Sequence, residues 1–124
     1  GHNPFSFRIP NLKSRPSSKG RVDFSDLGRL TKKLDAFYPG KRLKLFLSEF
    51  GVPAGGKDAE LGFGLSYKAQ VKWIKAAFKV QRELKRIYTL GWVHPFDRPD
   101  FGITTGLLKK SGKPKPGYYA FRAG

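Results

Sequence analysis

The chain has 124 residues, a length that allows one domain with a single core. It contains no cysteine and only two histidines, which excludes disulfides, a zinc–thiolate site and a His-rich metal cluster. Its 25 Lys plus Arg against 9 Asp plus Glu give a formal net charge of +16, while no apolar run is long enough to span a membrane and no segment resembles a signal peptide.

Residues 1–22 are predicted to form a long loop, because turn-forming residues recur throughout the segment. Loops of this length in compact domains are usually functional or disordered. A helix over 25–38 follows, with Ser25 as its N-cap and Pro39–Gly40 as its stop. The apolar residues of this helix fall on one stripe, which consists of Leu27, Leu30, Leu34 and Phe37.

The stretch LFLSEFGVPAG, residues 45–55, joins an apolar run to a carboxylate. The run predicts a strand over 43–49, since an unbroken apolar run bounded by turn residues is typical of a strand covered on both faces. Glu49 ends this strand, and a glycine-rich loop over 54–65 comes next. Chemistry is placed at the carboxyl ends of strands in α/β sheets and barrels. The alternative is that Glu49 is only a charge leaving the core for water.

A second helix is predicted over 66–86, with Ser66 as its cap. Nearly everything outside its basic stripe is apolar, and this arc covers roughly two-thirds of the circumference. Such a wide arc suits a helix that touches a strand and a neighbouring helix on each side, as the outer helices of an α/β barrel do. The basic stripe consists of Lys68, Lys72, Lys75, Lys79, Arg82 and Arg86.

A second strand over 87–93 ends in a segment whose side chains could take part in chemistry, namely Trp92, His94, Phe96 and Asp97. A last helix over 116–122 begins at Pro116, where proline is tolerated. Alternating strands and helices predict βαβ units with parallel strands. Because two parallel strands alone do not make a stable sheet, we expect part of a larger barrel. The absence of methionine has two explanations, excision of the initiator or a chain that is a piece of something longer.

The order of these motifs resembles the C-terminal part of a retaining glycoside hydrolase of clan A, nearest to families 5 and 39. The resemblance covers essentially the whole chain. It implies the portion of a (β/α)8 TIM barrel from the end of strand 6 through helix 8. It is carried by Ser48-Glu49-Phe50-Gly51 after a strand, Gly91-Trp92 ending the next, the tail GLLKKSGKPKPGYYAF, and the opening His2-Asn3-Pro4-Phe5.

The resemblance implies that Glu49 is the nucleophile and that Trp92 stacks on the sugar. His2 would be a polar contact beside the nucleophile, and Phe5 stands where related enzymes often have a tyrosine. The general acid/base would lie upstream of residue 1 and be supplied from outside this chain, so the chain alone would be inactive. No cofactor and no metal is expected. The substrate-binding candidates are Trp92, His2, Asn3, Phe5, His94 and Asp97, of which Asp97 is expected mainly to order its own loop.

The expected partners are an oligosaccharide or polysaccharide, together with the N-terminal part of the barrel or further copies of this chain. No membrane partner is expected. One rival hypothesis is a basic nucleic-acid-binding module, because a large positive charge is typical of proteins that bind polyanions. Nucleic acid is disfavoured since no aromatic residues are interleaved with the basic stripe. A third hypothesis is a non-catalytic carbohydrate-binding piece. The sugar and linkage are not encoded in these residues.

Overall fold

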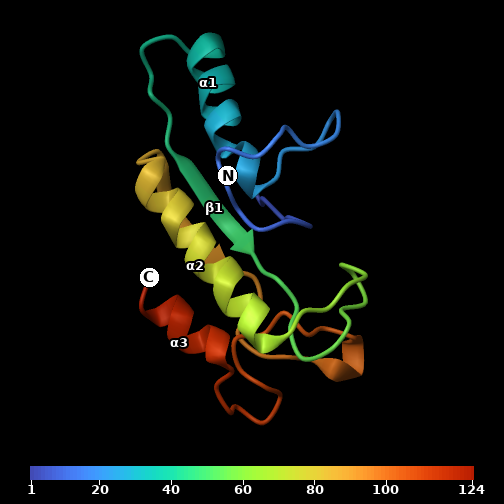
Figure 1. Ribbon diagram of the computed structural model, residues 1–124. Helices are drawn as coiled ribbons and strands as arrows, with labels where there is room; N and C mark the ends of the chain where they lie inside the picture. Colours follow the sequence, from blue (N-terminus) through green and yellow to red (C-terminus); the bar gives the residue numbers. More distant parts are fainter. The chain divides into compact units, whose positions relative to one another are not determined.

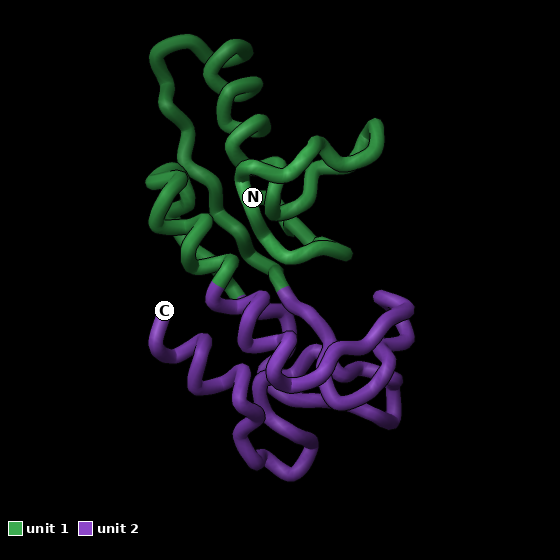
Figure 2. The backbone as a smooth tube through the Cα atoms, viewed as in Figure 1, with its two compact units in different colours: residues 1–50, 76–91 green, residues 51–75, 92–124 purple.

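The computed structural model describes residues 1–124 and contains three α-helices, two 3-10 helices and one sheet of two parallel strands (Figure 1). No helix is both long and apolar enough to cross a membrane. The chain divides into two compact units, residues 1–50 with 76–91 and residues 51–75 with 92–124 (Figure 2). The elements are η1 (Phe24–Asp26), α1 (Leu27–Phe37), β1 (Leu45–Phe50), α2 (Tyr67–Glu83), β2 (Ile87–Trp92), η2 (Pro99–Phe101) and α3 (Pro116–Arg122).

In unit 1, β1 pairs with β2, and the C-terminal part of α2 lies along β1 (Figure 1). Leu45 and Leu47 are buried while Phe46 between them is half exposed, as the alternation of side chains along a strand requires. The strands approach closely at Gly91, where a Cβ atom would lie 2.4 Å from the Ser48 carbonyl oxygen. A side chain at this position would push the two strands apart.

The N-terminus of α1 differs from the sequence prediction. Asp23, rather than Ser25, makes the cap: its carboxylate accepts a hydrogen bond from the Ser25 amide at 2.8 Å and begins a 3-10 turn that leads into α1. The Ser25 hydroxyl instead accepts a hydrogen bond from the Asn11 amide at 3.0 Å. The expected apolar stripe is buried only at Leu27, and Phe37 at the other end is 77% exposed.

The predicted fold class, the C-terminal portion of a (β/α)8 TIM barrel, is wrong. The structure is a small α/β fold with only two strands. The sequence argument required further strands to cover this pair, but other parts of the chain cover it. The N-terminal segment bonds to β1 through the His2 amide and the Phe46 carbonyl at 2.9 Å. The Phe24 ring of η1 packs edge-on against Phe50 with centroids 4.8 Å apart.

Unit 2 has its own apolar core, which includes Val52, Trp73, Ile74 and Leu107. Loops replace strands here: Phe96 pairs with Leu108 and Arg98 with Ile103 in isolated bridges. The buried Gln70 side chain of α2 donates to the Val52 carbonyl at 2.9 Å, which ties the helix to the segment after β1.

A buried ion pair holds the last loop of unit 2. The Lys115 ammonium, in a side chain with no exposed surface, contacts both Asp97 carboxylate oxygens at 2.9 and 3.1 Å. It also donates to the Thr104 carbonyl at 3.0 Å. Burial lowers the pKa of Lys115, and the hydrogen bond to Asp97 opposes that shift. Three loop segments therefore meet at one cation.

Replacing Lys115 by methionine should lower the unfolding free energy of unit 2 by about 2–4 kcal/mol, because Asp97 would keep its charge without its partner. Both tryptophans of the chain, Trp73 and Trp92, lie in unit 2, so urea unfolding followed by tryptophan fluorescence reports on this unit. The exposed neighbour Lys113 provides the matched control, Lys113→Met. Equal losses in the two variants would show that the ion pair does not stabilise the unit.

Candidate functional site

Glu49 lies in unit 1, one residue before the carboxyl end of β1, and is exposed. Its carboxylate has no hydrogen bond or ion pair, a property that it shares only with Glu60 among the acidic residues. Asp58 accepts hydrogen bonds from the amides of Glu60, Leu61 and Thr104. The remaining carboxylates are held in ion pairs: Asp23, Asp26, Asp35, Glu83, Asp97 and Asp100.

The N-terminal segment bonds to β1 at Ser48, whose side chain points to the opposite face of the strand from that of Glu49. The Asn3 side-chain oxygen accepts a hydrogen bond from the Ser48 hydroxyl at 2.7 Å, next to Glu49 in the sequence. The His2 ring is turned to another partner, since its Nε2 lies 3.1 Å from the Val22 carbonyl. Burial lowers the pKa of His2, with the Val22 hydrogen bond opposing. His2 is therefore neutral at neutral pH, and Nε2 carries the proton that it donates. Phe5 is partly exposed.

Trp92, His94 and Asp97 belong to unit 2, and each is bound within it. The Trp92 indole N–H donates to the Thr105 carbonyl at 2.8 Å, and its ring meets Phe121 edge-on at 5.6 Å between centroids. His94 Nδ1 lies 2.6 Å from the Thr105 hydroxyl. The structure thus brings Trp92 and His94 together at Thr105, whereas the Asp97 carboxylate is occupied by Lys115.

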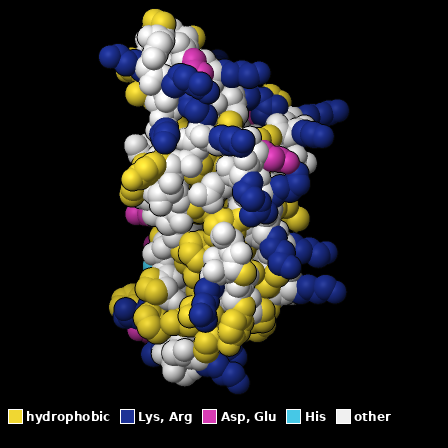
Figure 3. All heavy atoms as spheres, turned by 90° about the vertical axis from the view of Figure 1, so that its left-hand side faces the viewer, with side chains coloured by type: hydrophobic (Ala, Val, Ile, Leu, Met, Phe, Trp, Pro, Cys, Tyr) yellow, Lys and Arg dark blue, Asp and Glu magenta, His cyan; other side chains and the backbone are white.

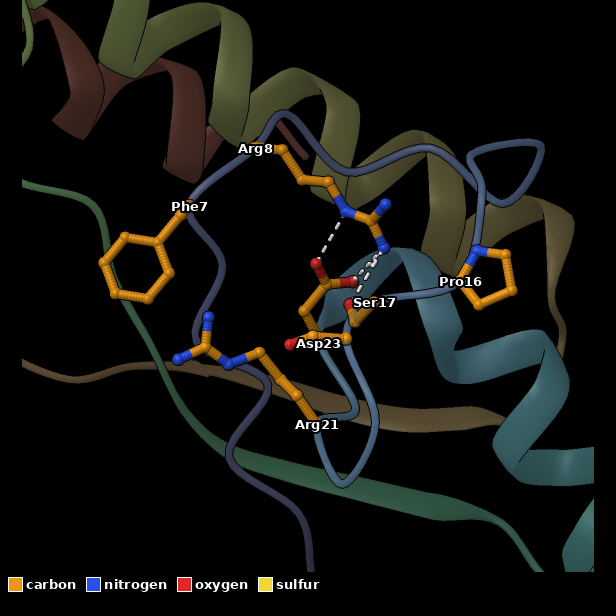
Figure 4. Close-up of a pocket in the computed structure, with 7 residues that line it drawn as sticks. Phe7, Arg8, Pro16, Ser17, Arg21 and Asp23 are labelled. Carbon is orange, nitrogen blue, oxygen red and sulfur yellow. Dashed lines mark hydrogen bonds and ion pairs between the residues drawn. The ribbon is translucent and has the colours of Figure 1, made fainter.

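A hollow of about 270 Å³ in unit 1 was not anticipated from the sequence (Figure 4). It is lined by Phe7, Arg8, Arg21, Asp23 and the turn at 16–18. The Arg8 guanidinium donates to both Asp23 oxygens, at 2.7 and 3.1 Å. It also donates to the Ser17 hydroxyl at 3.0 Å and to the Arg15 carbonyl at 2.6 Å. Arg8 is therefore bound through all three of its guanidinium nitrogens as part of the wall.

Arg21 is differently placed. Its guanidinium lies 5.0 Å from the centroid of the Phe7 ring, a cation–π distance, and it forms no ion pair. Phe7 itself is 56% exposed. Figure 4 shows the two side chains on the same side of the hollow, opposite the Arg8–Asp23 pair. A guanidinium without an ion pair and a largely exposed aromatic ring are thus neighbours.

No group of three or more His, Cys, Asp or Glu side chains is placed to hold a metal ion. Comparison with known proteins found no matching family model, no matching curated protein and no matching solved structure.

Asp26 should make the stability of unit 1 sensitive to acid. Burial raises the pKa of Asp26, but hydrogen bonds from Ser17 and Asp23 and from the Arg29 guanidinium outweigh it, so the net shift is downward. A carboxyl group with a lowered pKa stabilises the fold above its ordinary pKa, and this stabilisation is lost as pH falls through the lowered value. The loss is expected below about pH 4.

Asp26→Asn should therefore lower the unfolding free energy at neutral pH by about 1–3 kcal/mol, through the loss of its charged hydrogen bonds. The variant should also lose less stability than the wild type on acidification. Urea unfolding followed by far-UV circular dichroism at several pH values measures both effects. Glu60→Gln is the control, since Glu60 has no partner. A variant with an unchanged acid profile would contradict the role given to Asp26.

Proposed function

We propose that this chain carries the nucleophilic carboxylate of a retaining glycoside hydrolase and that Glu49 is this nucleophile. The observation that carries the proposal is an exposed carboxylate without a partner near the end of β1, in a chain where nearly every other carboxylate is held by a cation or by backbone amides. With 25 cationic side chains available, an unpaired carboxylate at this position is notable. The motif resemblance described above assigns the same residue.

Retaining hydrolysis uses two carboxyl groups about 5–5.5 Å apart, one that attacks the anomeric carbon and one that protonates the leaving oxygen. The other carboxylates of unit 1 are engaged by Arg8, Arg29, Arg86 and Lys79. Within this proposal the acid/base group is therefore supplied from outside the chain. Glu49 would form the covalent glycosyl intermediate, which water would then hydrolyse.

The neighbours of Glu49 would position it. The hydrogen bond between Asn3 and Ser48 fixes the strand end, so that the carboxylate is held by the backbone and not by a side-chain partner. For unit 2, taken by itself, Trp92 stays a proposed sugar-stacking residue: its N–H is bound to Thr105, and the residue is partly exposed.

A second candidate is polyanion binding without catalysis. Lys and Arg side chains are prominent on the face shown in Figure 3, where acidic side chains are few. The basic residues of α2, Lys68, Lys72, Lys75, Lys79 and Arg82, are all exposed. In this case the removal of the Glu49 charge would leave ligand binding intact, and no covalent intermediate would form.

The decisive experiment is covalent trapping. Mechanism-based fluoroglycosides with a dinitrophenolate leaving group need little acid assistance, so they test the nucleophile without the missing acid/base. Incubation of the chain with a panel of such donors should add one sugar at Glu49, as detected by intact mass and peptide mapping. Glu49→Gln should remove the adduct with little effect on folding, because the amide is nearly isosteric.

Glu60→Gln is the matched control, because Glu60 is the other exposed carboxylate without a partner. It should retain full labelling. An adduct that persists in Glu49→Gln, or that fails to form with every donor of the panel, would refute the assignment.

A further inference from the structure

Two guanidinium groups line the hollow beside Phe7: Arg8 is bound by protein groups, whereas Arg21 has no carboxylate partner. Arg8 donates hydrogen bonds to Asp23, to Ser17 and to the Arg15 carbonyl, and its charge neutralises that of Asp23. Arg21 has no carboxylate partner and meets only the Phe7 ring, at 5.0 Å from its centroid. The net charge facing the hollow is therefore positive, and the guanidinium that supplies it is held beside an exposed aromatic ring.

An adjoining hollow of about 250 Å³ shares Arg21 and the 16–18 turn. Its lining adds Lys19, Lys33 and Arg29, whereas its one carboxylate, Asp26, is already paired. The two hollows together thus form a basic, partly aromatic depression. Clefts lined by charges of one sign raise the local concentration of ligands of the opposite charge.

We propose that the hollow at Phe7 and Arg21 binds one carboxylate-bearing sugar unit of an acidic polysaccharide. The Arg21 fork matches the geometry of a carboxylate and can bind it through two parallel hydrogen bonds. The exposed part of the Phe7 ring offers an apolar surface for the pyranose ring. The choice of a sugar rests on the proposed function, whereas the charge and aromatic character come from the hollow itself.

The shape of the hollow favours a single sugar unit over single-stranded nucleic acid. Strand-binding proteins use a row of aromatic rings on which successive bases stack, along a basic groove. The hollow has one ring, Phe7, and a volume of about 270 Å³. Inorganic phosphate would satisfy Arg21 but would leave the apolar surface of Phe7 unused.

The test is a titration of the whole 124-residue chain, followed by heteronuclear NMR and calorimetry. The ligands are a defined oligogalacturonate, the same oligosaccharide with its carboxylates methyl-esterified, inorganic phosphate and a short single-stranded DNA. We expect the oligogalacturonate to bind at least about tenfold more tightly than its ester, with shifts concentrated at residues 7, 16–18 and 21.

Arg21→Gln should weaken oligogalacturonate binding by about tenfold to a hundredfold, because a charge-assisted pair is lost. Arg15→Gln is the matched control: it removes the same charge from the same loop, at a side chain that does not line the hollow. Phe7→Leu should weaken binding of the acid while keeping its preference over the ester. Covalent labelling at Glu49 is measured separately, so failure of the catalytic proposal and failure of this one are separate results.

Three results would overturn the inference. Equal affinity for the acid and its ester would exclude recognition of the carboxylate. Tighter binding of phosphate or DNA than of oligogalacturonate at the same residues would assign the hollow to phosphate groups. Equal losses in Arg21→Gln and Arg15→Gln would show that net charge, and not this hollow, attracts the ligand.

Discussion

The Arg8 guanidinium joins segments of unit 1 that have no regular structure of their own. Through Asp23 and Ser17 it fastens the N-terminal segment to the turn that starts η1, and Asp26 adds Arg29 from α1 to the same network. The chain has only 9 Asp plus Glu, so few such ion pairs can connect distant segments. Lys115 and Asp97 serve unit 2 in the same way. These ion pairs thus connect loop segments that lie outside the two-stranded sheet.

The acidic residues that form ion pairs differ in their surroundings from Glu49. Asp23 and Asp26, whose side chains are 5% exposed, are largely removed from solvent and matched with a cation, whereas Asp35, 46% exposed, pairs with Arg86 at the surface. Glu49 is exposed and unmatched, so it makes no visible contribution to the fold. A charge that is not used for stability is available for a ligand.

Local features were predictable from the sequence to a useful degree, whereas their assembly was not. The apolar run before Glu49, the Ser66 cap and the proline before the last helix mark β1, α2 and α3, because capping and periodicity act over a few residues. Helix α2 stops at Glu83, and Arg86 leaves the expected basic stripe to bind Asp35 at 2.9 Å.

The pairings of Arg8 with Asp23 and of Lys115 with Asp97 span loops without periodicity, so no local pattern shows them. The barrel was wrongly inferred because the wide apolar arc of α2 was taken to need neighbouring helices and the strand pair to need further strands.

Lys115 differs from every other lysine of the chain in one respect that has a practical consequence. All the others are exposed, while Lys115 has no accessible surface and a lowered pKa. An amine-acylating reagent would therefore modify the rest and spare this one for as long as its surroundings stay closed. Once they open, the amine regains contact with water and reacts as the other lysines do. The degree of acylation at a single position thus records how often this part of the chain opens, even in a crude mixture and without any spectroscopic label.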